Sequence, residues 1–477
     1  MNVKKNYLYN LMYKILTMIL PLVTVPYVSR VLNPEGVGTY AYTLSIVQYF
    51  VIIGMLGIGT YGNKMVAMAR DNKENLSKTF LSIYSLQFIL TLSSVFFYLI
   101  FVYVFMQEFR MIALIQTIYL LSIVIDCTWF FSGLEQFKKV VTRDVLIKVL
   151  GLISIFTFVK NEDDLVIYTI IMSLSVLIGQ LIMWFYVKEY IIFTSVSWND
   201  IFRHIKPTFV YFLPQVAAQV YFVLNKTMIG IFSTTIEVGI FDYADKILKV
   251  ALAVVTSLGV VMLPRMSNTF AKGDIVKAKV YINKSLDFTT LLAVPIMLGL
   301  AGIAKELIPW YMGEDFNRSI PVLIIISPTI LLMAWSGVFG AQYMVPLGKM
   351  KEFTISLYAG AIVNLTVNLL LIKPFGSIGA AVGTLSAELA VTLVQLFYVR
   401  KEINVLLVIP KTIKYLISGI IMYILVRYIG NTLGSSMLVT FLQIVFGAII
   451  YFTFVIIFEI ISKDGLIINE IKKRWKK

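Results

Sequence analysis

Residues 36–62 read GVGTYAYTLSIVQYFVIIGMLGIGTYG, and this stretch decides how the rest of the chain is interpreted. Its last six residues, 57–62, match Gly-x-Gly-x-x-Gly, the pattern that holds a dinucleotide pyrophosphate, and residues 36–41 nearly match it. A dinucleotide loop needs a short strand before it and a helix after it in a βαβ unit. Here the two glycine patterns instead enclose one long apolar stretch. We therefore predict a membrane helix whose glycine-rich ends permit close packing and local bending, and no nucleotide site.

The composition of the whole chain agrees with a membrane protein. Hydrophobic residues make up 59% of the 477 residues, charged residues make up only 14%, and the mean hydropathy is +0.86. A soluble domain is typically about 45–50% apolar with Gly included. The apolar runs are long enough for helices that cross a hydrocarbon core of roughly 30 Å. The sequence thus predicts an all-α polytopic membrane protein.

Apolar runs between charged or Pro/Gly-rich breaks predict about 14 transmembrane helices. They lie at 11–32, 39–62, 80–106, 111–132, 145–160, 165–187, 208–231, 240–263, 286–304, 320–340, 354–373, 378–399, 412–428 and 438–461.

The distribution of Lys and Arg supports this count, because cytoplasmic loops retain positive charge. With the N-terminus placed inside, the cytoplasmic segments hold 31 of the 41 Lys and Arg residues. Adding or removing one central span would destroy this alternation. We therefore expect an even number of spans, both termini in the cytoplasm and a basic cytoplasmic tail.

The net charge of +15 and the shortage of reactive side chains limit the function further. A polybasic membrane face fits anionic lipid headgroups, so no nucleic acid partner is expected. The single cysteine, Cys127, excludes a disulfide within the chain, and the single histidine, His204, leaves a zinc site or a Ser-His-Asp triad without its central part. We predict no catalytic residues, no metal and no cofactor.

Two stretches of the chain indicate an internal duplication. Residues 19–42 and 212–245 each place Leu-Pro near the start of a span, then a basic residue, Val-Gly, aromatic residues and Ala. The general abundance of Gly, Pro and aromatic residues in membrane helices is the alternative explanation. A six-helix repeat predicts an N-lobe at 1–200 with spans 1–6, a C-lobe at 201–402 with spans 7–12, and spans 13–14 with the tail at 403–477.

Five ordered segments carry a resemblance to a known family. They are VLNPEGVGTYAYTLSIVQYF (31–50), GIGTYGNKMVAMAR (57–70), DCTWFFSGLEQFK (126–138), VGIFDYADKILKV (238–250) and VMLPRMSN (261–268). The chain resembles the bacterial polysaccharide flippases of the multidrug/oligosaccharidyl-lipid/polysaccharide exporter superfamily, and the resemblance covers nearly its whole length.

The resemblance implies a MATE-like fold of two six-helix lobes plus two C-terminal helices, located in the bacterial cytoplasmic membrane. It implies alternating-access translocation of undecaprenyl-pyrophosphate-linked oligosaccharide repeat units for capsule or O-antigen. A polysaccharide polymerase and export machinery are the implied protein partners. Such a flippase is not an enzyme.

Basic residues inside predicted spans are candidates for binding the substrate, because a charge in hydrocarbon costs at least ~2.5–3.5 kcal/mol. Arg30 and Lys226 lie at similar outer depths on the first and seventh spans. Both could bind a pyrophosphate, and snorkelling to the interface is the alternative for Arg30. Lys246 and Lys249 follow Asp242 and Asp245 by four residues each, so we expect ion pairs along one helix face, with a ligand or gating role as the other hypothesis.

Two further carboxylates lie within apolar spans. Glu388 falls near the middle of the twelfth span, where it is a candidate for coupling transport to an H⁺ or Na⁺ gradient or for a neutral hydrogen bond between helices. Asp126 lies nearer the cytoplasmic end of the fourth span, where loop anchoring is the stronger interpretation.

Three other classes of protein are alternative interpretations of this sequence. A multidrug exporter of the same superfamily would use intramembrane carboxylates for organic cations, whereas the charges singled out here as substrate ligands are positive. A major facilitator would carry G-x-x-x-D-R-x-G-R-R between spans two and three, and residues 64–78 lack it. A membrane glycosyltransferase or polysaccharide polymerase would need an outer catalytic loop, and the acidic loops at 160–164 and 304–319 lack a DxD-like metal pair.

Overall fold

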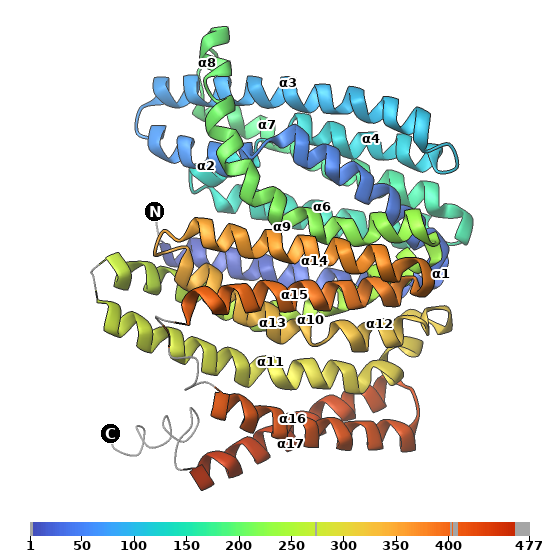
Figure 1. Cartoon of the computed structure of the whole chain (residues 1–477). Helices are drawn as coiled ribbons and strands as arrows, with labels where there is room; N and C mark the ends of the chain where they lie inside the picture. The colour runs from blue at the N-terminus through green and yellow to red at the C-terminus, as the bar shows by residue number, and fades with distance from the viewer. Residues whose placement is uncertain (1–2, 272–273, 401–402, 404–408, 463–477) are drawn as a thin grey trace. The chain divides into compact units, whose positions relative to one another are not determined.

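Apolar segments fold as helices because lipid offers no partner for a free backbone N–H or C=O group. The computed structural model describes residues 3–271, 274–400, 403 and 409–462, and its regular elements there are helical. The first group comprises α1 (Val3–Met55), α2 (Ile58–Ala69), α3 (Lys73–Phe105), α4 (Arg110–Val124), α5 (Thr128–Gly133), α6 (Phe137–Phe158), η1 (Glu162–Asp164), α7 (Leu165–Tyr190), α8 (Trp198–Phe202) and α9 (Ile205–Phe232) (Figure 1).

The remaining elements follow a similar pattern of long helices and short connections. They are α10 (Thr235–Ala271), α11 (Ile275–Met312), η2 (Glu314–Phe316), α12 (Ser319–Ile326), α13 (Thr329–Ser336), η3 (Gly337–Met344), α14 (Met350–Phe375), α15 (Ser377–Val399), α16 (Ile409–Leu433) and α17 (Met437–Ser462).

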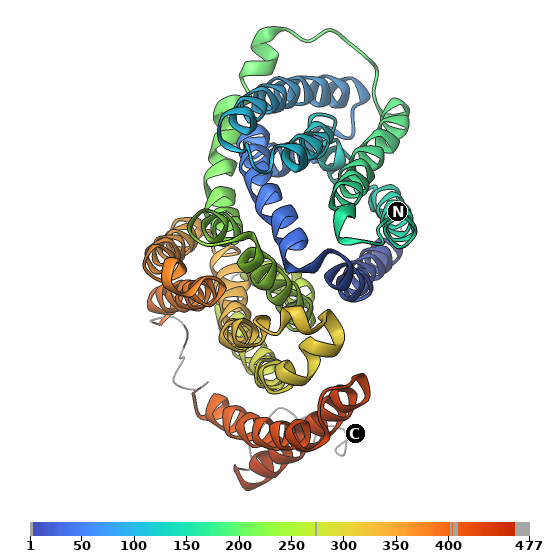
Figure 2. The ribbon, with the colours of Figure 1, turned by 90° about the vertical axis from the view of Figure 1, so that its right-hand side faces the viewer.

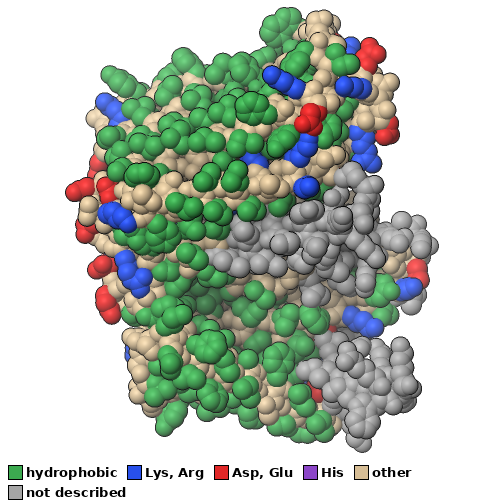
Figure 3. Space-filling view, turned by 180° about the vertical axis from the view of Figure 1, so that it is seen from behind, with side chains coloured by type: hydrophobic (Ala, Val, Ile, Leu, Met, Phe, Trp, Pro, Cys, Tyr) green, Lys and Arg blue, Asp and Glu red, His purple; other side chains and the backbone are tan. Residues whose placement is uncertain are grey.

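The predicted fold class is confirmed. Every predicted span falls on one or more of these helices, and ten helical stretches within the described residues are long and apolar enough to cross a membrane. Hydrophobic side chains cover much of the surface seen in Figure 3, and charged side chains gather mainly toward the helix ends. This arrangement is typical of helices surrounded by lipid.

The chain divides into two compact units, Met1–Gly230 and Ile231–Lys477. Figure 2 looks roughly along many of the helices, so each unit is seen as a bundle. In the first unit, α2, α3, α5 and α7 surround a core that contains Phe80, Phe130 and Met183. In the second, α10, α11, η3 and α15 pack around Ile282, Phe339 and Val399. The division into repeat-derived lobes at residues 200 and 402 remains a prediction, and the basic tail at 463–477 lies outside the described residues.

The first two predicted spans are joined more tightly than expected. The first span and the second span as far as Met55 form one element, α1, that is interrupted by a kink at Asn33, whose φ is 54° and ψ is 172°. The residue before a proline avoids the α region, and asparagine tolerates positive φ better than most residues. Asn33 precedes Pro34, so the kink replaces the short loop that hydropathy suggested.

Candidate functional site

The glycine-rich segment GIGTYG (57–62) lies at the joint between α1 and α2. Gly57 has a φ of 78°, and a Cβ atom there would lie 2.7 Å from the backbone of Phe212 in α9. A Cβ on Gly62 would lie 2.5 Å from the ring of Trp129 in α5. The predicted close packing is therefore confirmed at Gly57 and Gly62, where any side chain would collide with a neighbouring helix, whereas a Cβ atom on Gly59 would meet nothing within 4 Å.

The predicted ion pairs on the eighth span are present on α10. Lys246 Nζ lies 2.8 Å from Asp242 Oδ2, and Lys249 Nζ lies 2.6 Å from Asp245 Oδ2. The carboxylates are largely buried, whereas the lysine side chains are 36% and 47% exposed. Lys246 also lies over the ring of Tyr243, 4.3 Å from its centroid. This face thus combines buried acids with lysines that other molecules can reach.

The two cations predicted to bind substrate lie on different helices of the first unit. Arg30 is exposed on α1, in the turn before the Asn33 kink, and its Nη1 donates a hydrogen bond of 2.9 Å to the Pro26 carbonyl oxygen. Lys226 is half-buried on α9, next to Thr227, whose hydroxyl lies 2.8 Å from the Ser45 hydroxyl of α1. The hydrogen bond between Ser45 and Thr227 thus ties α9 beside Lys226 to α1.

The two predicted coupling carboxylates have different surroundings. Glu388 is only 2% exposed, on α15 in the second unit. Asp126 lies in the first unit at a break between α4 and α5, and its Oδ1 accepts a hydrogen bond of 2.8 Å from the Thr128 backbone N–H. Asp126 thus bonds to the backbone at the start of α5, and the anchoring role of Asp126 and the coupling role of either residue stay predictions.

Two side chains satisfy the backbone carbonyls that the break between α4 and α5 releases. Gln87 of α3 donates to the carbonyl oxygens of Ile123 and Asp126 at 2.9 and 2.8 Å. Trp184 of α7 donates to the Ile125 carbonyl oxygen at 2.7 Å. Irregular backbone at membrane depth persists only where protein or water satisfies it, so these bonds stabilise the break.

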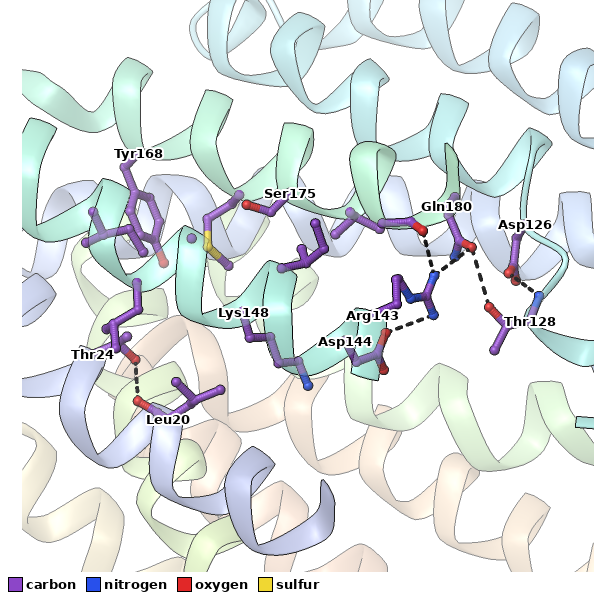
Figure 4. A pocket seen from close by; sticks show the side chains of 17 residues that line it. Leu20, Thr24, Asp126, Thr128, Arg143, Asp144, Lys148, Tyr168, Ser175 and Gln180 are labelled. Carbon is purple, nitrogen blue, oxygen red and sulfur yellow. Dashed lines mark hydrogen bonds and ion pairs between the residues drawn. The ribbon is translucent and has the colours of Figure 1, made fainter. Parts of the chain in front are cut away.

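The break borders a cavity of about 590 Å³ between α1, α6 and α7 (Figure 4). Four charged residues line it, and we call them the cavity cluster: Asp126, Arg143, Asp144 and Lys148. Arg143 Nη1 donates to the Gly179 carbonyl oxygen at 3.0 Å and to Gln180 Oε1 at 3.1 Å, and Nη2 lies 2.8 Å from Asp144 Oδ1. The Nε atom of Arg143 is buried and has no hydrogen-bond partner within the part of the chain that the structure describes.

The sequence did not reveal the cavity cluster. The sequence predicts that the fifth span begins at residue 145. It therefore assigns Arg143, Asp144 and Lys148 to a cytoplasmic segment or to its border with that span. Helix α6 begins at Phe137 instead, so these residues lie within its second to fourth turns. The i, i+4 spacing of Asp144 and Lys148 beside an apolar run was the signal that pointed to a helix.

Sequence reasoning also missed two buried ion pairs in the second unit, which we call the α11 anchors. In one, Asp287 of α11 lies 2.8 Å from Lys411 Nζ and accepts a hydrogen bond of 2.7 Å from the Tyr415 hydroxyl. In the other, Glu306 accepts bonds of 3.0 and 2.9 Å from Arg427 Nη1 and one of 3.2 Å from Gln443 Nε2. Both anchors join α11 to α16, and the second also reaches α17.

His204 has a structural position in the turn between α8 and α9. It is 3% exposed, its Nδ1 lies 2.7 Å from the Tyr61 hydroxyl, and its Nε2 lies 3.0 Å from the Ser82 hydroxyl. Burial, assisted by the charge of Arg203, lowers the pKa of His204 from 6.5 to about 4. At neutral pH a neutral imidazole therefore links α2 and α3 to the start of α9.

Comparison with known sequences identifies the family of the chain. The sequence model of the family described as "Polysaccharide biosynthesis protein" matches residues 3–270. The Escherichia coli (strain K12) protein named "Putative O-antigen transporter" is 26% identical over 407 residues, which cover 84% of this chain and 98% of that protein. The Bacillus subtilis (strain 168) protein named "Lipid II flippase MurJ" is 21% identical over 40% of this chain and 36% of its own length.

Comparison with solved structures concerns the fold. A structure of lipid II flippase MurJ in an inward closed conformation has a TM-score of 0.79 at 17% identity, covering 96% of this chain and all of that one. An inward-facing multidrug resistance MATE family transporter of the MOP superfamily has a TM-score of 0.58 at 13% identity, covering 82% of this chain and 98% of that one. The helices are therefore arranged as in this class of transporters.

Proposed function

Because the chain belongs to the polysaccharide biosynthesis protein family, we propose that it is a flippase for undecaprenyl-pyrophosphate-linked oligosaccharide repeat units. It would move them across the bacterial cytoplasmic membrane for capsular or O-antigen polysaccharide. The observation that carries the proposal is the match to the Escherichia coli transporter, which extends over almost the whole of that protein. The relatives are transporters and flippases, so no bond-making chemistry is proposed.

The charged part of the proposed substrate determines which side chains can bind it. A pyrophosphate diester carries about two negative charges, and its oxygens suit a bidentate guanidinium together with an ammonium point charge. Arg30 is exposed and so can reach a ligand, and Lys226 is half-buried. We assign the pyrophosphate to these two residues. Lys246 and Lys249 are secondary ligands, since Asp242 and Asp245 already neutralise them.

Translocation then follows from alternating access. The polyprenyl tail would stay in lipid while the charged group and glycan cross the membrane through a site that opens to one side at a time. Glu388 or Asp126 would couple this motion to an H⁺ or Na⁺ gradient. Both termini would lie in the cytoplasm, where basic segments contact anionic lipids, and a polymerase and export machinery would receive the flipped unit.

The direct test is reconstitution of the purified protein in vesicles with a labelled lipid-linked oligosaccharide in one leaflet. We expect the label to become accessible in the opposite leaflet with its glycan unchanged. Formation of new glycosidic bonds would instead identify a glycosyltransferase or polymerase. Export of an organic cation without movement of the glycolipid would identify the multidrug exporter.

A further inference from the structure

The cavity between α1, α6 and α7 is built from residues that the proposed transport path does not require, apart from Asp126. Its volume of about 590 Å³ falls within the range of about 300–1,000 Å³ that is typical of small-molecule sites. In Figure 4 the polar side chains Asp126, Arg143 and Gln180 lie toward one end, and Tyr168 lies at the other. Lys148 and Ser175 lie between these ends in Figure 4, and the lining also includes the apolar residues Ile147, Leu152, Ile155, Met172 and Val176. The cavity is therefore amphipathic along its length.

The dimensions of the cavity match one leaflet of a membrane. Arg143 lies six residues after the start of α6 at Phe137, which places it ~9 Å along the helix. From Arg143 to Ile155 the lining extends a further ~18 Å along α6. Half of a hydrocarbon core measures ~15 Å. A lipid chain whose head group lies at the charged end would thus run along the apolar part of the cavity.

The charges of the lining select the head group. Two carboxylates, Asp126 and Asp144, and two basic groups, Arg143 and Lys148, leave the lining with no net formal charge. A net anion would add an uncompensated charge to this low-dielectric space, whereas a zwitterion would not. Arg143 is only 7% exposed, and its Nε atom still lacks an acceptor among the described residues. The Arg143 side chain borders the cavity, so its positive charge would attract a phosphate placed there.

We propose that this cavity binds a zwitterionic membrane phospholipid, with one acyl chain between α1, α6 and α7. The phosphate would lie toward Arg143 and Lys148, and the ammonium toward Asp126 and Asp144. The lipid fills space between α1 and the pair of α6 and α7. The proposal is independent of which substrate the protein transports.

Native mass spectrometry of the detergent-solubilised full-length protein tests the proposal. The probes are phosphatidylethanolamine and phosphatidylglycerol with identical acyl chains at equal concentration. Gly151→Leu and Met172→Trp each place a larger side chain into the cavity, since both positions line it. Ile153→Trp is the matched control, because Ile153 lies on the same helix as Gly151 but is 55% exposed on its outer surface.

We expect wild type and Ile153→Trp to retain one phosphatidylethanolamine, with a preference of about tenfold over phosphatidylglycerol, and both filled variants to lose it. Equal or stronger retention of phosphatidylglycerol, retention of neither lipid, or unchanged retention in the filled variants would overturn the proposal. If the filled variants do not fold, photoactivatable phosphatidylethanolamine on wild type decides. The labelled residues must then fall within 147–155 of α6 or 168–176 of α7, and labelling elsewhere alone would reject the site.

Discussion

The cavity cluster of the first unit and the α11 anchors of the second both place acids beside bases in apolar helices, but they differ in what surrounds the charges. In the anchors, Asp287 and Glu306 are 5% and 4% exposed, and each accepts bonds from a cation and from a neutral side chain. In the cavity cluster, the Arg143 side chain is equally buried but lines a cavity of about 590 Å³.

The difference separates charges that hold helices together from charges that can receive a ligand. Asp287 and Glu306 lie 19 residues apart on α11, or ~28 Å, so the anchors fasten α16 to α11 at both ends of a membrane-spanning length. Tyr451 of α17 adds a bond of 2.9 Å to the Leu291 carbonyl oxygen. Each anchor acid is thus bonded to two side chains of neighbouring helices, whereas the cavity cluster lines a cavity of about 590 Å³.

The largest effect is expected where an anchor loses one partner. Glu306→Leu leaves the Arg427 guanidinium without its buried carboxylate, which should cost about 3–5 kcal/mol of the free energy of unfolding. The double variant Glu306→Leu/Arg427→Met removes both charges and should recover most of that loss. Thermal unfolding of the purified variants in detergent measures the difference. A double variant no more stable than the single one would show that the ion pair does not act as an anchor.

The free energy of unfolding should depend on pH because His204 stays neutral while it is buried. His204 has a folded pKa of about 4 against an unfolded value of 6.5, so the unfolded chain binds a proton first as pH falls. The contribution of His204 to stability is complete above pH 6.5 and is lost between pH 6.5 and 4, at about 1.4 kcal/mol per pH unit.

The test compares unfolding of wild type and His204→Gln across this pH range. The wild type should lose stability more steeply than the variant, in which the other titrating groups are unchanged. Parallel curves for the two proteins would contradict the role of a neutral imidazole between Tyr61 and Ser82.

A smaller loss is expected from the cavity cluster. Arg143→Met removes the hydrogen bonds to Gly179 and Gln180 and the pair with Asp144, for a cost of about 1.5–3 kcal/mol. The cost stays below that of an anchor because Asp144 is 21% exposed and borders the cavity. Unfolding of Arg143→Met beside Glu306→Leu checks the ranking. An equal or larger loss of unfolding free energy in Arg143→Met would mean that the cavity cluster holds helices together as the anchors do.

The two regions also show which features the sequence could predict. Apolar runs predict helices because the bilayer enforces internal backbone bonding, and the four-residue spacing on α10 predicts its ion pairs for the same geometric reason. Hydropathy could not place Arg143 inside α6, because Arg143 belongs to the charged stretch from Lys138 to Asp144, which precedes the apolar run that begins at residue 145. It could not reveal that Gln87 and Trp184 bond to the break after α4, or that Glu306 meets Arg427, since these partners lie far apart in sequence and meet only through packing.

Arg30 and Lys226 should show the opposite behaviour to the anchors, with almost no effect on stability and a large one on transport. Arg30 is exposed and Lys226 is half-buried, so Arg30→Gln and Lys226→Gln should unfold within about 0.5 kcal/mol of wild type. Each removes one cation from the proposed pyrophosphate site, which should lower flipping of a lipid-linked oligosaccharide by at least about tenfold.

Lys160→Gln is the matched control, because this exposed lysine lies near Tyr27 of α1. Normal flipping by Arg30→Gln and Lys226→Gln would remove both residues from the substrate path, and equal loss in Lys160→Gln would replace a specific site with a general effect of positive charge.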